Sequence, residues 1–185
     1  VLRKTAKTRL NLEMAATKEM FAIALEVKPD MVTLVPEKRQ ELTTEGGLDV
    51  KVNFDYLKKF VEGLRDADIP VNLFIDPTLD AVKSSHKIGS DGVEIHTGSY
   101  ADARDGKARA LELKRVVEAV ALSHRLGLKT HAGHGLDYKN IKDVAAIKEI
   151  DEFAIGFSII ARSIYTGINE AVREMKRLII EGRAG

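Results

Sequence analysis

The chain has 185 residues, which is enough for one domain with a buried core and does not require a second. Charged residues make up 31% of it but nearly cancel, to a formal net charge of +1, which argues against a protein that binds nucleic acids or membrane surfaces. It contains no cysteine, which excludes disulfides and thiol chemistry, and no apolar run long enough to span a membrane, so we expect a cytoplasmic protein.

Short apolar strands alternate with helical patterns along the whole chain. Thr17 and Asn169 stand at helix N-cap positions, and Gly127 follows the longest helical pattern as a C-terminal cap would. Strand and helix in alternation predict a parallel sheet with right-handed crossovers. We predict strands at 9–15, 30–37, 70–76, 91–97, 128–133 and 152–158, and helices at 17–27, 54–67, 78–89, 107–127, 138–150 and 168–182.

One face of several predicted strands is polar. Glu13 shares a face with Arg9 and Asn11, and Glu94 shares one with His96. A sheet with helices on both sides should be apolar on both faces, whereas a barrel can enclose polar groups. We therefore expect an α/β fold, the (β/α)8 TIM barrel. Because six strand–helix units are visible, we expect a single domain over residues 1–185 that corresponds to the last six units of a longer protein.

The predicted strand ends carry titratable groups, and active sites of such barrels lie there. Glu13 is a candidate general base or acid, and the alternative is a buried ion pair with Arg9. His134 lies in the turn AGHG, and three interpretations remain open: a catalytic group, a structural hydrogen-bonding group, or a metal ligand together with His96 and His131.

Two loops have the composition of ligand-binding segments. The loop PEKRQELTTEGGLD (36–49) combines cations such as Arg39, hydroxyls at Thr43 and Thr44, and a glycine pair, which is typical of a lid; a solvated charged loop is the alternative. After the last strand, Gly156 precedes a short helical segment. Phosphate is commonly bound at this position in (β/α) barrels, although a small residue packed in a buried strand is the alternative.

Taken together, RLNLEMA, LVPEKRQELTTEGGLD, EIHTGSYAD and AGHGLDYKN resemble the pyridoxine 5′-phosphate synthase family, the ring-closing enzymes of deoxyxylulose-dependent vitamin B6 synthesis. The similarity covers essentially the whole chain. It implies a phosphate-binding (β/α)8 barrel that assembles as a homo-octamer. It also implies the condensation of 1-deoxy-D-xylulose 5-phosphate with 3-amino-2-oxopropyl phosphate, with release of phosphate and water, and no metal or organic cofactor.

The resemblance also implies roles for single residues. Glu13 and His134 match the family's catalytic glutamate and its proton-donating histidine. The positions that match substrate-binding residues are Thr43, Gly135, Gly156 and Phe157. The family's first two strand–helix units, which carry a further catalytic histidine and phosphate-binding arginines, have no counterpart in this sequence, so we expect the 185-residue chain alone to be inactive. Phe157 stands where many members have histidine.

Two other functions remain as alternatives. Another phosphate-sugar barrel enzyme, an epimerase or aldolase, would need a metal held by the three histidines or a Schiff base at Lys129, whose side chain should point inward. A barrel without activity would instead serve as a scaffold or oligomer partner.

Overall fold

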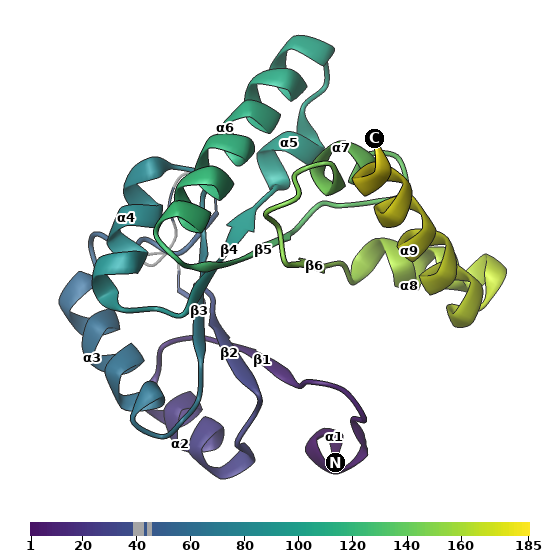
Figure 1. Cartoon of the computed structure of the whole chain (residues 1–185). Helices are drawn as coiled ribbons and strands as arrows, with labels where there is room; N and C mark the ends of the chain where they lie inside the picture. Colours follow the sequence, from purple (N-terminus) through teal and green to yellow (C-terminus); the bar gives the residue numbers. More distant parts are fainter. Residues whose placement is uncertain (39–42, 44–45) are drawn as a thin grey trace.

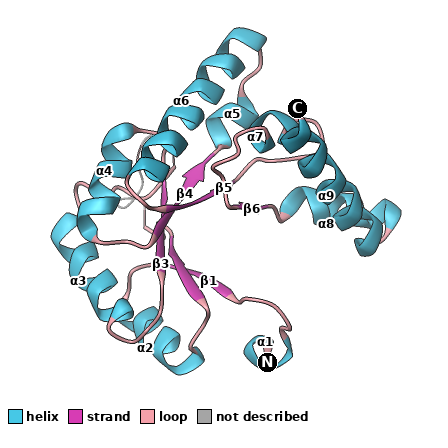
Figure 2. Cartoon of the chain, viewed as in Figure 1, coloured by secondary structure: helices cyan, strands magenta, loops and turns pink. Residues whose placement is uncertain are grey.

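The computed structural model describes residues 1–38, 43 and 46–185 (Figure 1). Six parallel strands form one sheet, and their order in the sheet is their order in the chain. The sheet curls into a half barrel with helices on its outer side (Figure 2). All six predicted strands are confirmed, at shorter lengths: β1 (Asn11–Met14), β2 (Met31–Leu34), β3 (Val71–Ile75), β4 (Gly92–His96), β5 (Lys129–Gly133) and β6 (Glu152–Ala154).

Helices connect and cover these strands, and α2, α3, α4 and α6 follow one another around the outside of the curl (Figure 1). Two short helices near the strand ends differ from the prediction: α7 is shorter than the helix expected at 138–150, and α5 was not expected. The helices are α1 (Leu2–Thr5), α2 (Lys18–Val27), α3 (Phe54–Arg65), α4 (Leu79–Ile88), α5 (Gly98–Asp102), α6 (Gly106–Arg125), α7 (Ile141–Ala145), α8 (Phe157–Thr166) and α9 (Ile168–Ala184). No helix in the described part of the chain is long and apolar enough to cross a membrane.

Local sequence explains where several helices begin and end. The Thr17 hydroxyl accepts a hydrogen bond from the backbone N–H of Met20, which confirms the predicted N-cap of α2. Gly127, with φ of 75°, lies just beyond α6 and ends it in the left-handed conformation that glycine adopts easily. The N-cap predicted at Asn169 is wrong: α9 begins at Ile168, and Gly167 is its N-cap.

The core lies between the outer face of the sheet and the helices. Alternate strand residues such as Leu34, Leu73 and Ile95 are fully buried there, against helix residues such as Leu57 and Val120. Each such side chain stabilises the fold by about 1.5–3 kcal/mol. Because successive strand residues point to opposite faces, the polar residues that alternate with these apolar ones lie on the inside of the curl. This confirms the polar inner face that the alternation in the strands predicted.

Hydrogen bonds join polar side chains of different strands on the inner face, both between neighbours and, from β3 to β5, past the strand between them. The side chains of Asn11 and Thr33 bond between β1 and β2, and the Nδ2 atom of Asn72 lies 3.2 Å from the Nδ1 atom of His131. Arg9 pairs with Glu152 at the start of β6, so the alternative ion pair between Arg9 and Glu13 is wrong. The inner face is therefore a hydrogen-bonded polar layer, and it leaves Glu13 available at the open end of the curl.

Candidate active site

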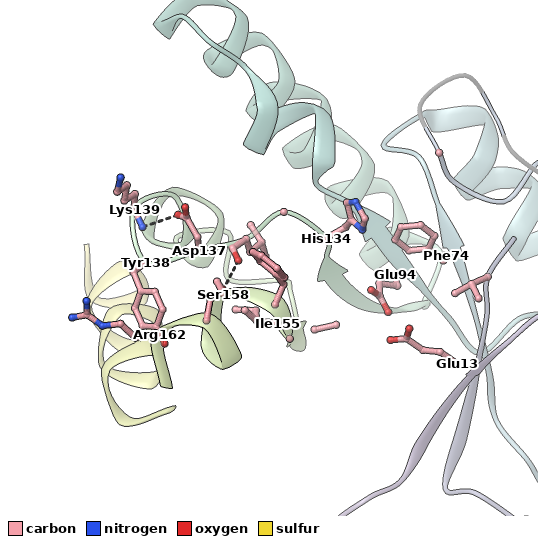
Figure 3. Close-up of a pocket in the computed structure, with 18 of the residues that line it drawn as sticks. Glu13, Phe74, Glu94, His134, Asp137, Tyr138, Lys139, Ile155, Ser158 and Arg162 are labelled. Atoms are coloured by element: carbon pink, nitrogen blue, oxygen red, sulfur yellow. Dashed lines mark hydrogen bonds between the residues drawn. The ribbon is translucent and has the colours of Figure 1, made fainter. Parts of the chain in front are cut away.

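A cavity of about 1400 Å³ opens at the carboxyl ends of the strands. Glu13 from β1, Glu94 from β4 and His134 after β5 line it, and Figure 3 shows the two carboxyl groups facing each other with the His134 ring beyond them. These three side chains come from positions up to 121 residues apart and meet because parallel strands end at one edge of the sheet. The two catalytic candidates from the sequence thus share one cavity with a third group.

Glu94 is the functional candidate that the sequence prediction missed. Its side chain is only 5% exposed, and its Oε2 atom has no hydrogen-bond partner among the described residues. Burial, together with the negative charges of Glu13 and Glu152, raises the pKa of Glu94 to about 7. A carboxyl group with this pKa can both donate and accept a proton at neutral pH.

The neighbouring strand makes room for this carboxyl group. A Cβ atom on Gly133 would lie 2.3 Å from the Oε1 atom of Glu94, so any larger residue would displace the carboxyl group. Gly133 pairs with His96 in the register of β4 and β5, one pleat beyond Glu94. Gly133 is therefore needed to make room for the Glu94 carboxyl group, which the turn AGHG does not reveal from the sequence alone.

His134 adopts an unusual backbone conformation at the mouth of the cavity. Its φ angle is 77°, in a region that residues with a Cβ atom rarely occupy. Its ring lies 4.8 Å from that of His96 and 6.3 Å from that of Phe74, measured between ring centroids. Gly135 follows with φ of 76°, and a Cβ atom there would lie 2.6 Å from the Cβ atom of Ala101. The turn therefore needs glycine at 135 and holds the imidazole of His134 open to the cavity.

The three histidines that the metal alternative requires do not converge. His131 points into the interior, where it bonds with Asn72, and burial there lowers its pKa. No group of three His, Asp or Glu side chains within residues 1–38, 43 and 46–185 has an arrangement that could hold a metal ion. Of the three open interpretations of the AGHG turn, this leaves the catalytic and the structural ones.

The Schiff-base alternative is wrong as well. Lys129 is exposed at the amino-terminal end of β5, and its Nζ atom lies 3.5 Å from a carboxylate oxygen of Asp151. Lys129 lies on the same face as Asn72 but at the amino-terminal end of β5, whereas the cavity opens at the carboxyl ends of the strands, so its side chain does not line the cavity.

The end of the predicted lid loop is attached to β3. The backbone N–H of Gly47 donates to the Oδ1 atom of Asp76 at 3.0 Å, and the Thr43 hydroxyl donates to the carbonyl oxygen of Gly47 at 3.3 Å. Burial alone would raise the pKa of Asp76, but the nearby His96 imidazole, 3.4 Å away, the Thr43 hydroxyl and the hydrogen bond from Gly47 outweigh it and lower this pKa. Residues 39–42 and 44–45 of this loop, which include Arg39 and Thr44, lie outside the described residues.

The predicted short helix after the last strand is confirmed as α8, which begins at Phe157 with Gly156 at its N-cap. Both residues line the cavity, as does Gly135 across from them. The Phe157 side chain is 90% exposed. Since the first N–H groups of a helix have no partner within the helix, this end of α8 is suited to an anion.

Comparisons with known proteins identify the family of this chain. Residues 1–181 match the family model described as pyridoxal phosphate biosynthesis protein PdxJ. The pyridoxine 5′-phosphate synthase of Geobacter metallireducens is 58% identical over 179 residues, covering 97% of this chain and 75% of that protein. That of Thermodesulfovibrio yellowstonii is 57% identical over 181 residues, covering 98% of this chain and 74% of that protein.

Similar solved structures support the fold alone, because their sequences are distant. The BexX/CysO complex of Amycolatopsis orientalis aligns with a TM-score of 0.62 at 11% identity, covering 94% of this chain and 66% of that chain. A mandelate oxidase aligns with a TM-score of 0.57 at 12% identity, covering 94% and 56%. Since the family model spans nearly the whole chain and more than half of the aligned residues are shared with these synthases, the chain belongs to the PdxJ family of pyridoxal phosphate biosynthesis proteins.

Proposed function

We propose that this chain carries the active site for closing the pyridine ring of vitamin B6. The reaction condenses 1-deoxy-D-xylulose 5-phosphate with 3-amino-2-oxopropyl phosphate to pyridoxine 5′-phosphate, with release of phosphate and water. The observation that carries the proposal is the meeting of Glu13, Glu94 and His134 in one cavity beside a glycine turn and a helix N-terminus. Membership in a family whose curated relatives are named for this activity supports it.

We assign the phosphate of the amino-ketone to the gap between Gly135 and the start of α8. Gly135, Gly156 and Phe157 line the same cavity, and the exposed N–H groups of the first turn of α8 favour an anion. Because phenylalanine has no polar side-chain group, Phe157 contributes its backbone N–H. We assign the pentulose phosphate to the lid side, near Thr43.

The carboxyl groups and the imidazole supply the proton transfers. The amine must lose a proton as it attacks the pentulose ketone, and Glu13, open to the cavity, accepts it. His134 donates a proton to the oxygen that leaves as water. Glu94, with its pKa near 7, returns protons between the addition and dehydration steps. The product ring is aromatic, so the site mainly has to position two phosphorylated substrates and move protons between them.

We also propose that residues 1–185 form one domain and that this domain supplies the last six strand–helix units of a (β/α)8 barrel. The sheet leaves β1 and β6 each with one unpaired edge, and α8 exposes the apolar side chains of Ile160, Ile164 and Tyr165. Further strand–helix units would cover both. The chain spans about three quarters of the length of its curated relatives. A natural polypeptide with the 20.4 kDa mass of this chain would contradict the assignment.

We also propose that the protein acts in the cytoplasm as a homo-octamer, with small phosphorylated molecules as its substrates. Light scattering after size-exclusion chromatography tests the assembly directly. A monomer or dimer at micromolar concentration would refute the octamer and leave the chemistry of the site untouched.

The proposed function is tested by supplying both phosphorylated substrates to the natural polypeptide and measuring pyridoxine 5′-phosphate. We expect product, unaffected by a chelator. We expect Glu13→Gln and His134→Ala each to lower kcat by about 10²–10⁴-fold, the usual contribution of a positioned acid or base. Glu26→Gln and His86→Ala are matched controls, because both side chains are exposed on outer helices. No product from the wild type would defeat the proposal, and loss of activity with chelator would favour a metal enzyme.

A further inference from the structure

Four consecutive carbonyl groups of the turn after β5, from Gly133 to Leu136, accept hydrogen bonds from side chains of other elements. The Thr97 hydroxyl lies 2.7 Å from the carbonyl oxygens of both Gly133 and His134, and shares its one hydrogen between them. Nδ2 of Asn140 donates to the carbonyl oxygen of Gly135 at 3.0 Å. The Ser158 hydroxyl donates to that of Leu136 at 2.8 Å. We call Thr97, Asn140 and Ser158 the carbonyl clamp.

Two of the clamp side chains are buried and held on both sides. Thr97 is fully buried between β4 and α5, and its own backbone N–H donates to the carbonyl oxygen of Gly133 at 2.9 Å. Asn140 is 6% exposed, and its Oδ1 atom accepts a hydrogen bond from the backbone N–H of Asp137 at 2.8 Å. The Tyr100 hydroxyl donates to the backbone carbonyl oxygen of Asn140 at 2.8 Å. Neither side chain can move without breaking several hydrogen bonds.

The clamp offsets the strain of the turn. A residue with a Cβ atom in a sparsely populated backbone region is strained, and His134 is such a residue. The hydrogen bonds of the clamp hold the carbonyl groups on both sides of His134 and so stabilise this conformation. The left-handed conformations of His134 and Gly135 are therefore stable although the turn lies open to the cavity.

The clamp also determines which backbone groups of the turn remain unpaired. Its carbonyl oxygens are occupied, whereas the N–H groups of His134, Gly135 and Leu136 form no hydrogen bond within the described part of the chain. Successive unpaired N–H groups in a turn form a concavity suited to an anion. Ser158 lies in the first turn of α8, so its bond to Leu136 also fixes the spacing between this turn and the helix N-terminus.

We infer that Thr97, Asn140 and Ser158 are positioning residues of the proposed reaction: Thr97 aims His134 at the substrate, and Ser158 fixes the two halves of a phosphate site at their separation. Asn140 supports both through Gly135. The inference rests on the proposed function but goes beyond it, since none of the three touches the reacting atoms. Thr97 and Ser158 should affect different kinetic constants. Thr97 acts on proton transfer and therefore on kcat, whereas Ser158 acts on phosphate binding and therefore on KM.

The test of Thr97 compares a variant that keeps the hydroxyl with one that loses it. We expect Thr97→Val to lower kcat by about 10–100-fold, the scale of a misplacement of about 1 Å, with the KM for the pentulose phosphate unchanged. Thr97→Ser keeps the donor and should restore kcat to within about three-fold of the wild type. Thr166→Val, which removes an exposed hydroxyl at the end of α8, is the matched control and should leave both constants unchanged.

Ser158 is tested by phosphate affinity. We expect Ser158→Ala to raise the KM for the amino-ketone phosphate by about five- to ten-fold, which corresponds to the loss of one hydrogen bond. The affinity for inorganic phosphate, measured by calorimetry, should fall by the same factor. Ser163→Ala removes a hydroxyl that only bonds within α8 and should change neither value.

The outcomes separate the inference from the proposed function. A wild-type protein without product refutes the function. An active wild type with a folded Thr97→Val variant at the wild-type rate refutes the role of Thr97. If Thr97→Val does not fold, Ser158→Ala decides, because a folded Ser158→Ala protein with unchanged KM and phosphate affinity overturns the clamp as a positioning device.

Discussion

The buried carboxyl group of Glu94 should make the protein less stable as the pH rises. Its pKa is raised from 4.5 to about 7 by burial and by the charges of Glu13 and Glu152. Between these two pH values the folded protein keeps a proton that the unfolded chain has already lost. The free energy of unfolding therefore falls through this window, by about 3 kcal/mol in total, and stays low above it.

The substitution Glu94→Gln isolates this effect, because glutamine has nearly the same shape and stays neutral at every pH. We expect the difference in unfolding free energy between variant and wild type to shift in favour of the variant by about 3 kcal/mol between pH 4.5 and pH 8. Urea unfolding at both pH values measures it as a shift of the midpoint at constant slope. Glu26→Gln, at an exposed position of α2, is the control and should give the same difference at both pH values.

The same variant should lose activity. Glu94→Gln cannot exchange a proton, so we expect kcat to fall by about 10²-fold or more even where the protein becomes more stable. A difference in unfolding free energy that does not change with pH would refute the raised pKa of Glu94. A variant that is slower and also less stable at pH 8 would show that the ionised carboxylate has a structural partner.

Three further variants test the packing around the site and one helix cap. Gly133→Ala should cost about 1–3 kcal/mol in unfolding free energy and lower kcat, because its methyl group meets the Glu94 carboxyl group; unchanged stability would contradict the close approach. Tyr100→Phe should lower the melting temperature by about 2–4 °C through loss of the hydrogen bonds to Asn140 and Asp143, and an unchanged melting temperature would mean that this hydroxyl contributes nothing. Thr17→Ala should cost about 1 kcal/mol in urea unfolding with activity retained, and activity loss would contradict a purely local cap.

The strands and the inner polar face could be predicted because each depends on short-range alternation. Glu13 and Asn72 each alternate with apolar residues along their strands. Because those apolar neighbours pack against helices, the side chains of Glu13 and Asn72 point to the inner face. The short helices could not be predicted so well. The turn from Asp137 to Asn140 is closed by their own side chains, which delays the start of α7 in a segment whose apolar spacing looks helical from residue 138.

The sequence singled out cavity-lining residues where one residue carries its own signal, and overlooked Glu94, whose environment is formed by several strands. His134 and Gly135 stand in a recognisable turn, and the resemblance to a family identified Glu13. The raised pKa of Glu94 depends on burial and on the charges of Glu13 and Glu152, which lie on other strands. The room for its carboxyl group depends on Gly133, on the neighbouring strand and 39 positions away, so no local pattern reveals this site. Alternation indicated the face on which Lys129 lies, but not that it stands at the amino-terminal end of β5, where its side chain is exposed and does not line the cavity.

The order of the strands has a consequence for how mutations reach the site. Glu13 stands on β1 and His134 follows β5, so their separation is the sum of every strand pairing between them. A small tilt in β2 or β3, neither of which supplies a proton, would accumulate across the sheet and move the two groups apart. Interior positions such as Thr33 and Asn72, which bond to residues of other strands, therefore help to set the distance between Glu13 and His134, and we expect substitutions there to change it.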